Sequence, residues 1–180
     1  MTESVYMTEP VYIHHGSDHY DPLRFIKVRN GDWMPNPAHG TGLWGSRSDE
    51  SADELYYGWE RWCRDNHFNL DRLSNSFRFI LPDADILTIS SEDDLIPLPK
   101  IHPWEPKRLD WMETIKLGEM PTPEQLHEFY MPNWCYLDFE KLAEEYDAIE
   151  MLHSGAFNDS LSTWDCDCIL VLRPGKIREV

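Results

Sequence analysis

Short apolar runs bounded by turn residues predict the β-strands of this chain. Val, Ile, Tyr and Phe favour the pleated, half-buried environment of a sheet, and clusters of Gly, Pro, Asn and Asp mark the turns between strands. The segment 168–172 gives the clearest prediction, because an unbroken apolar run is typical of a strand buried on both faces. The predicted strands cover residues 11–13, 77–81, 86–89, 146–150 and 168–172.

Apolar residues at helical spacing predict helices between these strands. The best-defined helix runs from Ser51 to about Asp65, because Ser51 can cap it and Glu54 can complete a capping box. Its apolar face comprises Ala52, Leu55, Tyr56, Trp59, Trp62 and Cys63. A second helix is expected to begin near residues 122–125, with Thr as cap and Pro in the first turn, and a third to span 138–145.

The order of these elements predicts the fold class. It is neither regular βαβ alternation nor all-β, so we expect a mixed α+β fold in one domain over residues 1–180. Residues 31–42 are rich in Gly and Pro, which is typical of a loop, and Leu43 and Trp44 form a short apolar step beyond it. Residues 92–122 are Pro-rich and predict an irregular insertion that still packs, because two tryptophans lie within it.

Composition indicates a globular chain and narrows its partners. Hydrophobic residues make up 41% and charged residues 27% of the 180 residues, and the formal net charge is -17. Such a charge disfavours bare nucleic acid and anionic membranes as partners, although it leaves room for a local basic pocket that binds one dinucleotide. A simpler interpretation is that the negative charge keeps the protein soluble. No apolar run reaches the ~18 residues of a membrane span, and residues 1–6 lack a signal-peptide pattern, so we expect a cytoplasmic location.

Four cysteines raise the question of metal or thiol chemistry. Without an export signal we expect reduced thiols. Cys166 and Cys168 have no second Cys pair at zinc spacing, so no metal is expected. A Cys nucleophile paired with a His has no local signature here, and no P-loop or Rossmann glycine pattern occurs.

The first candidate motif is His14-His15-Gly16-Ser17, directly after the first predicted strand. Gly lets a ligand approach the main chain closely, and an imidazole can donate a hydrogen bond to a ribose hydroxyl or a carbonyl. An ordinary turn with two surface histidines would show the same residues.

The second candidate motif is Gly42-Leu43-Trp44-Gly45-Ser46. Trp44 lies between glycines and therefore has little local packing, so its ring is free to face a cleft and stack on a nucleobase or nicotinamide. The alternative is a core tryptophan under a loop.

The third candidate motif is Trp164-Asp165-Cys166-Asp167-Cys168, at the entry to the last strand. Asp165 and Asp167 are two residues apart, so an extended chain would place them on one side. A carboxylate there could stabilise the positive charge that develops on a sugar during glycosyl transfer. A polar turn with Asp capping nearby N–H groups is the alternative.

In this order, the three motifs resemble those of the ADP-ribosyltransferase superfamily, on its diphtheria-toxin and poly(ADP-ribose)-polymerase side. That family has a His-Gly-Ser/Thr motif on the first strand, a Tyr just before a helix, and a Glu at the start of a later strand. His15 matches the family's His, Trp44 stands at the aromatic position, and Asp167 stands at the acidic position.

The resemblance implies NAD as substrate and a role for each matching residue. His15 would hold the adenosine-side ribose, the Gly16 backbone the nicotinamide carboxamide, and Trp44 would stack on the nicotinamide ring. Asp167 would bind the nicotinamide-side ribose and favour the oxocarbenium-like state, and Asp165 would orient an acceptor. Ser17 and Ser46 would add polar contacts.

The resemblance also implies the fold and the reaction. The fold would be a split, mostly antiparallel β core with flanking helices. Trp in place of Tyr would preserve stacking but remove the hydroxyl, and Asp in place of Glu indicates mono-ADP-ribosyl transfer or no transfer. The acceptor would be a protein or small molecule more readily than bare nucleic acid, and the context a toxin or a defence or modification effector.

Three alternatives stay open at this point. The domain could hold NAD or ADP-ribose without turnover, or it could carry RNA 2′-phosphotransferase chemistry on a related fold. The phosphotransferase would require basic residues that converge on phosphate, and Arg47, Arg61 and Arg64 cluster in sequence. The last alternative is an unrelated α+β protein in which the motifs match by chance.

Overall fold

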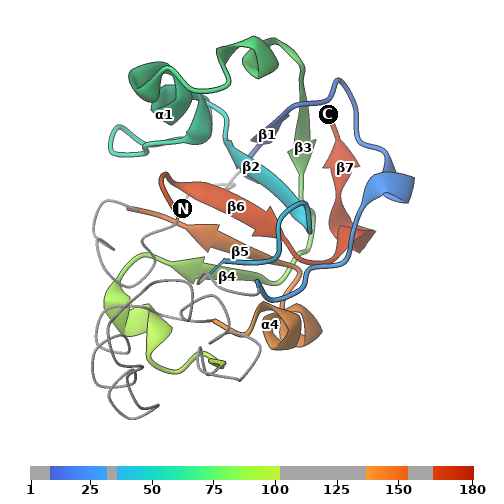
Figure 1. The fold of residues 1–180 in the computed structure, drawn as a ribbon, viewed down its shortest axis with the longest axis vertical. Coiled ribbons are helices and arrows are strands. Elements are labelled where there is room, and N and C mark those ends of the chain that lie inside the picture. The colour runs from blue at the N-terminus through green and yellow to red at the C-terminus, as the bar shows by residue number, and fades with distance from the viewer. Residues whose placement is uncertain (1–8, 32–35, 102–136, 154–163) are drawn as a thin grey trace, which may run out of the picture.

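A computed structural model describes residues 9–31, 36–101, 137–153 and 164–180, and it shows a mixed α+β fold (Figure 1). The described strands form one hydrogen-bonded series in the order β4-β5-β6-β2-β1-β3-β7. Neighbouring strands are antiparallel except for β4 and β5, which are parallel. The strands are β1 (Tyr12–His15), β2 (Leu43–Arg47), β3 (Ser76–Ile80), β4 (Ile86–Ile89), β5 (Ala148–Met151), β6 (Cys168–Val171) and β7 (Arg178–Glu179).

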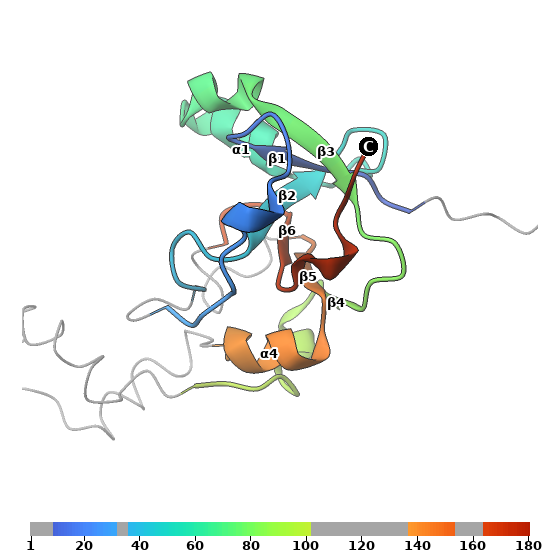
Figure 2. The same cartoon turned by 90° about the vertical axis from the view of Figure 1, so that its right-hand side faces the viewer.

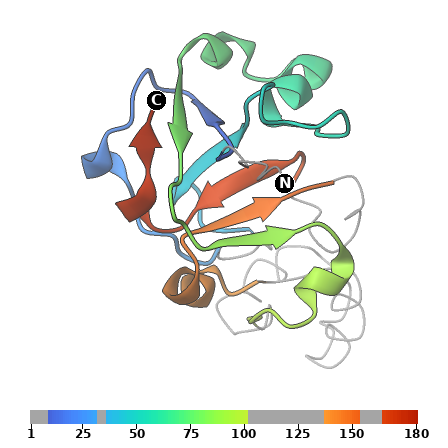
Figure 3. The ribbon, with the colours of Figure 1, turned by 180° about the vertical axis from the view of Figure 1, so that it is seen from behind.

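Two α-helices accompany the sheet in the described residues, α1 (Trp59–Asn66) and α4 (Phe139–Glu145). Figures 1 and 2 show α1 and α4 toward opposite ends of the sheet. Seen from behind in Figure 3, β3 and β7 lie side by side along one edge, and β4 forms the other edge. No helix within the described ranges has the length and apolar character that a bilayer span requires.

The sheet separates two apolar clusters. One contains Leu170, Ile149 and Met151 together with residues of α4. The other contains Tyr12, Phe79, Ile169 and Val171. Because side chains alternate along a strand, β6 contributes to both clusters and all of its residues are buried. The prediction that 168–172 is buried on both faces is therefore confirmed.

The other strand predictions are also confirmed, with small shifts in their bounds. The segments 11–13, 77–81, 86–89 and 146–150 correspond to β1, β3, β4 and β5. The short apolar step Leu43–Trp44 is the beginning of a full strand, β2, which pairs with both β1 and β6. The sequence did not predict β7, a two-residue strand with both side chains exposed.

The long helix predicted from Ser51 is wrong in its first half, because α1 begins only at Trp59. Ser51 does not cap a helix, since its hydroxyl accepts a hydrogen bond from the Val11 backbone N–H at 2.9 Å. Tyr57 is bound through its backbone to residue 167, as described below. These tertiary hydrogen bonds keep residues 51–58 in turns and override the helical spacing of their apolar side chains.

The helix predicted over 138–145 is confirmed as α4. Asp138 caps it, since its side chain accepts a hydrogen bond from the Lys141 backbone N–H at 3.1 Å. Of the Pro-rich segment 92–122, the described part includes a short 3-10 helix, Glu92–Leu95. Residues 102–122 and the helix expected near 122–125 lie outside the described residues.

Candidate functional site

The fold places the three candidate motifs on neighbouring strands. β2 lies between β1 and β6, so the segment with Trp44 and Ser46 separates the strand that ends at His15 from the strand that follows Asp167. Ile13 is opposite Ser46, and residues two apart in a strand share a face. His15, Trp44 and Ser46 therefore point to the same face of the sheet.

His15 is half-buried at the end of β1. Its Nδ1 lies 3.2 Å from the carbonyl oxygen of Leu73. A carbonyl only accepts, so the contact requires a proton on Nδ1, and in the neutral ring Nε2 becomes an acceptor. Neutral His15 would therefore accept a hydrogen bond from a ribose hydroxyl through Nε2, where the sequence had suggested a donor.

Gly16 has an exposed backbone with φ of +119°, a conformation that L side chains rarely adopt. A Cβ at this position would meet nothing nearer than His14 Nε2, at 3.9 Å. Ser17, the next residue, donates from its hydroxyl to the carbonyl of His19 at 3.2 Å, within an exposed turn. The Gly16 backbone N–H donates to the carbonyl of Asn75 at 2.7 Å, so this N–H is not available to a ligand that enters the space beside Gly16.

The sequence did not assign a separate role to His14, which joins the first and second motifs. Its Nδ1 lies 2.7 Å from the carbonyl oxygen of Trp44 on β2, and its ring contacts Phe77 with centroids 5.1 Å apart. Burial lowers the pKa of His14 below its ordinary value, and the hydrogen bond to Trp44 and the charge of His15 are smaller influences. His14 is therefore a neutral donor that orients β1 against β2.

Trp44 does not stand free in a cleft as its flanking glycines suggested. Its ring meets Trp164 edge-on with centroids 4.9 Å apart, and Trp164 in turn stacks near Phe139 of α4. Trp44 is only partly buried, so part of its ring still faces outward from the core cluster. The glycines were misleading because the packing partner comes from a distant segment of the chain.

Ser46 is buried and connects three parts of the site. Its hydroxyl donates to the backbone carbonyl of Asp167 at 3.1 Å and accepts from the backbone N–H of Trp59, the first residue of α1, at 2.9 Å. Only 5% of the residue is exposed. Both hydrogen-bonding functions of this hydroxyl are therefore used within the protein, which indicates a positioning role.

Asp165 and Asp167 have different surroundings, because the chain bends at Cys166 between them. Asp165 is exposed, and partial desolvation raises the pKa of its carboxyl. Asp167 is 1% exposed, and its Oδ2 accepts a hydrogen bond from the backbone N–H of Tyr57 at 2.9 Å. The Asp167 backbone N–H donates to the carbonyl of Tyr57 at 2.9 Å, so each of the two residues donates one hydrogen bond to the other.

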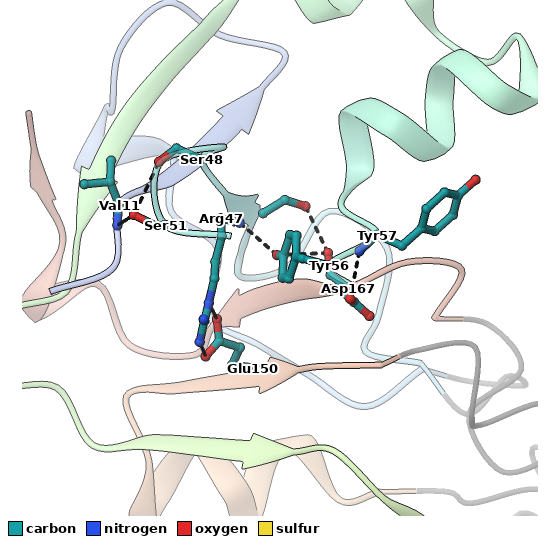
Figure 4. A network of polar contacts seen from close by, with 9 residues as sticks. Val11, Arg47, Ser48, Ser51, Tyr56, Tyr57, Glu150 and Asp167 are labelled. Atoms are coloured by element: carbon teal, nitrogen blue, oxygen red, sulfur yellow. Dashed lines mark hydrogen bonds and ion pairs between the residues drawn. The ribbon is translucent and has the colours of Figure 1, made fainter. Parts of the chain in front are cut away.

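The sequence missed a polar network on the other face of the sheet (Figure 4). Arg47 of β2 donates from Nε and Nη2 to the two carboxylate oxygens of Glu150 on β5, each at 2.7 Å. The Tyr56 hydroxyl accepts from the Arg47 backbone N–H at 2.8 Å and donates to the Asp167 carbonyl at 3.1 Å. Burial raises the pKa of Tyr56, so this hydroxyl keeps its proton. The only available signal was a charged residue, Glu150, at the end of the predicted strand 146–150.

The cysteines of the described residues are free and buried: Cys63, Cys166 and Cys168. Burial raises the pKa of the Cys63 thiol, so it is a poor nucleophile near neutral pH. Among the described side chains, no group of three or more His, Cys, Asp or Glu residues is arranged to hold a metal ion.

Comparisons with protein-family models, with curated proteins and with solved structures return no match to this chain.

Proposed function

We propose that this protein is a mono-ADP-ribosyltransferase that cleaves the nicotinamide–ribose bond of NAD and transfers ADP-ribose to an acceptor. The observation that carries the proposal is that three motifs, distant in sequence, lie at adjacent strands: the first at the end of β1, the second within β2 and the third leading into β6. The mostly antiparallel sheet is compatible with the family's β core, and the split form of that core is part of the proposal.

In this proposal, residues of the first two motifs would bind the dinucleotide. The carbonyl oxygen of Gly16 would accept from the nicotinamide carboxamide, since the Gly16 N–H is engaged by Asn75, and Nε2 of neutral His15 would accept from a ribose hydroxyl. The outward part of the Trp44 ring would stack on the nicotinamide. Trp164 would fix the tilt of that ring through their edge-on contact.

Asp167 would supply the negative charge that favours loss of nicotinamide. A carboxylate held near a developing oxocarbenium ion stabilises it without reorganisation, because its position is already fixed. Here the fixing groups are the Tyr57 N–H on the carboxylate, and Ser46 and Tyr56 on the backbone carbonyl. Exposed Asp165 would orient the acceptor at the surface.

A second candidate function, binding of NAD or ADP-ribose without turnover, is favoured by the burial of Asp167. A carboxylate that is 1% exposed and engaged by Tyr57 is less accessible to a sugar than an open catalytic acid would be. RNA 2′-phosphotransferase chemistry has less support, because its candidate arginines are engaged. Arg47 pairs with Glu150, Arg64 with Glu60, and Arg61 lies over the Tyr57 ring.

We also propose a cytoplasmic location, where NAD is abundant and thiols stay reduced, which suits the free cysteines among the described residues. NAD is the expected substrate, and the expectation of a metal-independent reaction remains part of the proposal. The acidic chain favours a protein or small-molecule acceptor over bare nucleic acid, and a toxin or a defence or modification effector is the expected context.

The experiment is nicotinamide release from NAD by the purified protein, compared with Asp167→Asn. Asn keeps an oxygen that can accept from Tyr57 N–H but lacks the charge, so it separates catalysis from positioning. Release by the wild type and its loss in Asp167→Asn, with unchanged unfolding, supports the transferase. If there is no release, calorimetry with NAD decides between the two functions. Binding supports the second function, which is binding without turnover, and the absence of binding refutes both.

A further inference from the structure

Helix α1 and the residues just after it carry a cluster of aromatic rings, which we call the α1 patch: Trp59, Trp62 and Phe68. The two tryptophans are partly buried against the core cluster, and Phe68 is exposed. The two indoles are stacked with centroids 5.1 Å apart and an interplanar angle of 11°. Phe68 meets both edge-on, at 5.9 Å from Trp59 and 5.5 Å from Trp62. The two tryptophans can stack because they lie three residues apart on α1, about one helical turn.

The chain closes this patch by reversing at the end of the helix. His67 adopts a left-handed conformation with φ of 53°, and the Phe68 N–H donates to the carbonyl of Cys63 at 2.9 Å. This C-terminal cap turns the chain back, so that Phe68 lies against the helix. Phe68 is nevertheless 45% exposed, and Leu70, two residues further on, is also 45% exposed. Phe68 and Leu70 therefore leave apolar surface exposed to solvent beside the two partly buried tryptophans.

The cationic groups next to the patch are already engaged. Arg64 donates to Glu60 at 2.6 Å, and the Arg61 guanidinium lies 5.1 Å from the centroid of the Tyr57 ring. The Tyr57 hydroxyl donates to the carboxylate of Asp65 at 2.9 Å. This surface therefore already contains a cation–π contact, between Arg61 and the ring of Tyr57, and the Tyr57 hydroxyl is hydrogen-bonded to a carboxylate.

We propose that the α1 patch binds an arginine-bearing basic segment of a partner protein. Indole faces attract guanidinium groups through their quadrupole, and the long arginine stem covers apolar surface. The chain has 33 acidic against 16 basic residues, so its field attracts a cationic partner. The same field repels nucleic acid, the other class of macromolecule that stacks on aromatic rings. The proposed role of the α1 patch does not depend on the proposed NAD chemistry, and the two are tested separately.

The test is calorimetric titration of the purified protein with an arginine hexapeptide and with a lysine hexapeptide of equal charge. Cation–π stacking and the planar guanidinium predict about 5-fold tighter binding of the arginine peptide. Phe68→Ala, and separately Trp62→Leu, should remove that preference. Leu23→Ala is the matched control, because Leu23 is 94% exposed in the 3-10 helix Pro22–Arg24 and should leave it unchanged.

If Trp62→Leu weakens the fold, Phe68→Ala alone still tests the proposal, because Phe68 is exposed whereas Trp62 is partly buried. Equal affinity for the two peptides would mean that only the acidic charge attracts them, and the proposal would fail. It would also fail if the preference survived both patch variants. Tighter binding of a single-stranded oligonucleotide than of the arginine peptide, lost on Phe68→Ala, would assign the patch to nucleic acid instead.

Discussion

Arg47 and Glu150 form a bidentate ion pair that joins β2 to β5 across the intervening strand β6. Both bonds are 2.7 Å long, and the residues are 103 positions apart in sequence. The Glu150 side chain is 4% exposed and that of Arg47 21%. The pair therefore fixes the spacing of three strands at the level where the third motif enters the sheet.

Loss of Arg47 should be more damaging than loss of Glu150. Arg47→Met leaves a buried carboxylate without its partner, which we expect to lower the free energy of unfolding by about 3 kcal/mol. Glu150→Gln should cost less, because the partly exposed guanidinium can regain water. Urea unfolding of both variants measures the difference.

The exposed pair of Arg64 and Glu60 supplies the control for this prediction. Arg64→Met should change the free energy of unfolding by only about 0.3 kcal/mol, since both side chains remain in solvent. Similar losses in Arg47→Met and Arg64→Met would contradict a special role for the buried pair.

Ser46→Ala should destabilise the protein and loosen the start of α1. The substitution removes the acceptor for the Trp59 N–H and one of two donors to the Asp167 carbonyl. We expect a loss of about 1–2 kcal/mol, measured by urea unfolding, with faster amide exchange at Trp59. Ser17→Ala, which removes only an exposed bond, serves as the reference and should stay within about 0.5 kcal/mol of the wild type.

Gly42→Ala and Gly40→Ala should differ sharply, although both positions have positive φ, +70° and +74°. A Cβ at Gly42 would lie 2.6 Å from Leu170 Cδ1 and 2.9 Å from the Val171 carbonyl oxygen, whereas one at Gly40 would meet nothing within 4 Å. We expect about 1 kcal/mol of backbone strain at Gly40 and about 3 kcal/mol or more at Gly42. Thermal unfolding compares them, and equal losses would show that β2 and β6 can move apart.

His14 should make the protein less stable in mild acid. Burial lowers its pKa in the folded state, so the unfolded chain binds a proton first as the pH falls through about 6.5. Stability is therefore lost from that pH down to the lowered folded pKa, by at most ~1.4 kcal/mol per pH unit for one proton. His14→Gln removes this titration, so the decline in urea midpoint between about pH 7.5 and pH 5.5 should be smaller than in the wild type. An identical decline would show that other groups cause it.

Local sequence patterns determined much of the secondary structure. The apolar run at 168–172 and the Asp cap at 138 specify β6 and α4 because the interactions involved lie within a few residues. The place of the His-Gly motif at the end of β1 was equally readable, since the apolar run and the glycine that follows it are neighbours in sequence. These features need no knowledge of distant neighbours.

Tertiary structure decided the rest. Residues 51–58 leave the helix that their spacing predicts, because Val11 and Asp167 bind them. Trp44 packs on Trp164, a partner that no local pattern indicates. Strand order, the burial of Asp167 and the Arg47–Glu150 pair depend on contacts between distant segments, with 103 positions between Arg47 and Glu150 and 110 between Tyr57 and Asp167. Their energy comes from desolvated groups that meet only after the chain has collapsed, so the linear sequence supplied the strands and the motifs but not their pairing.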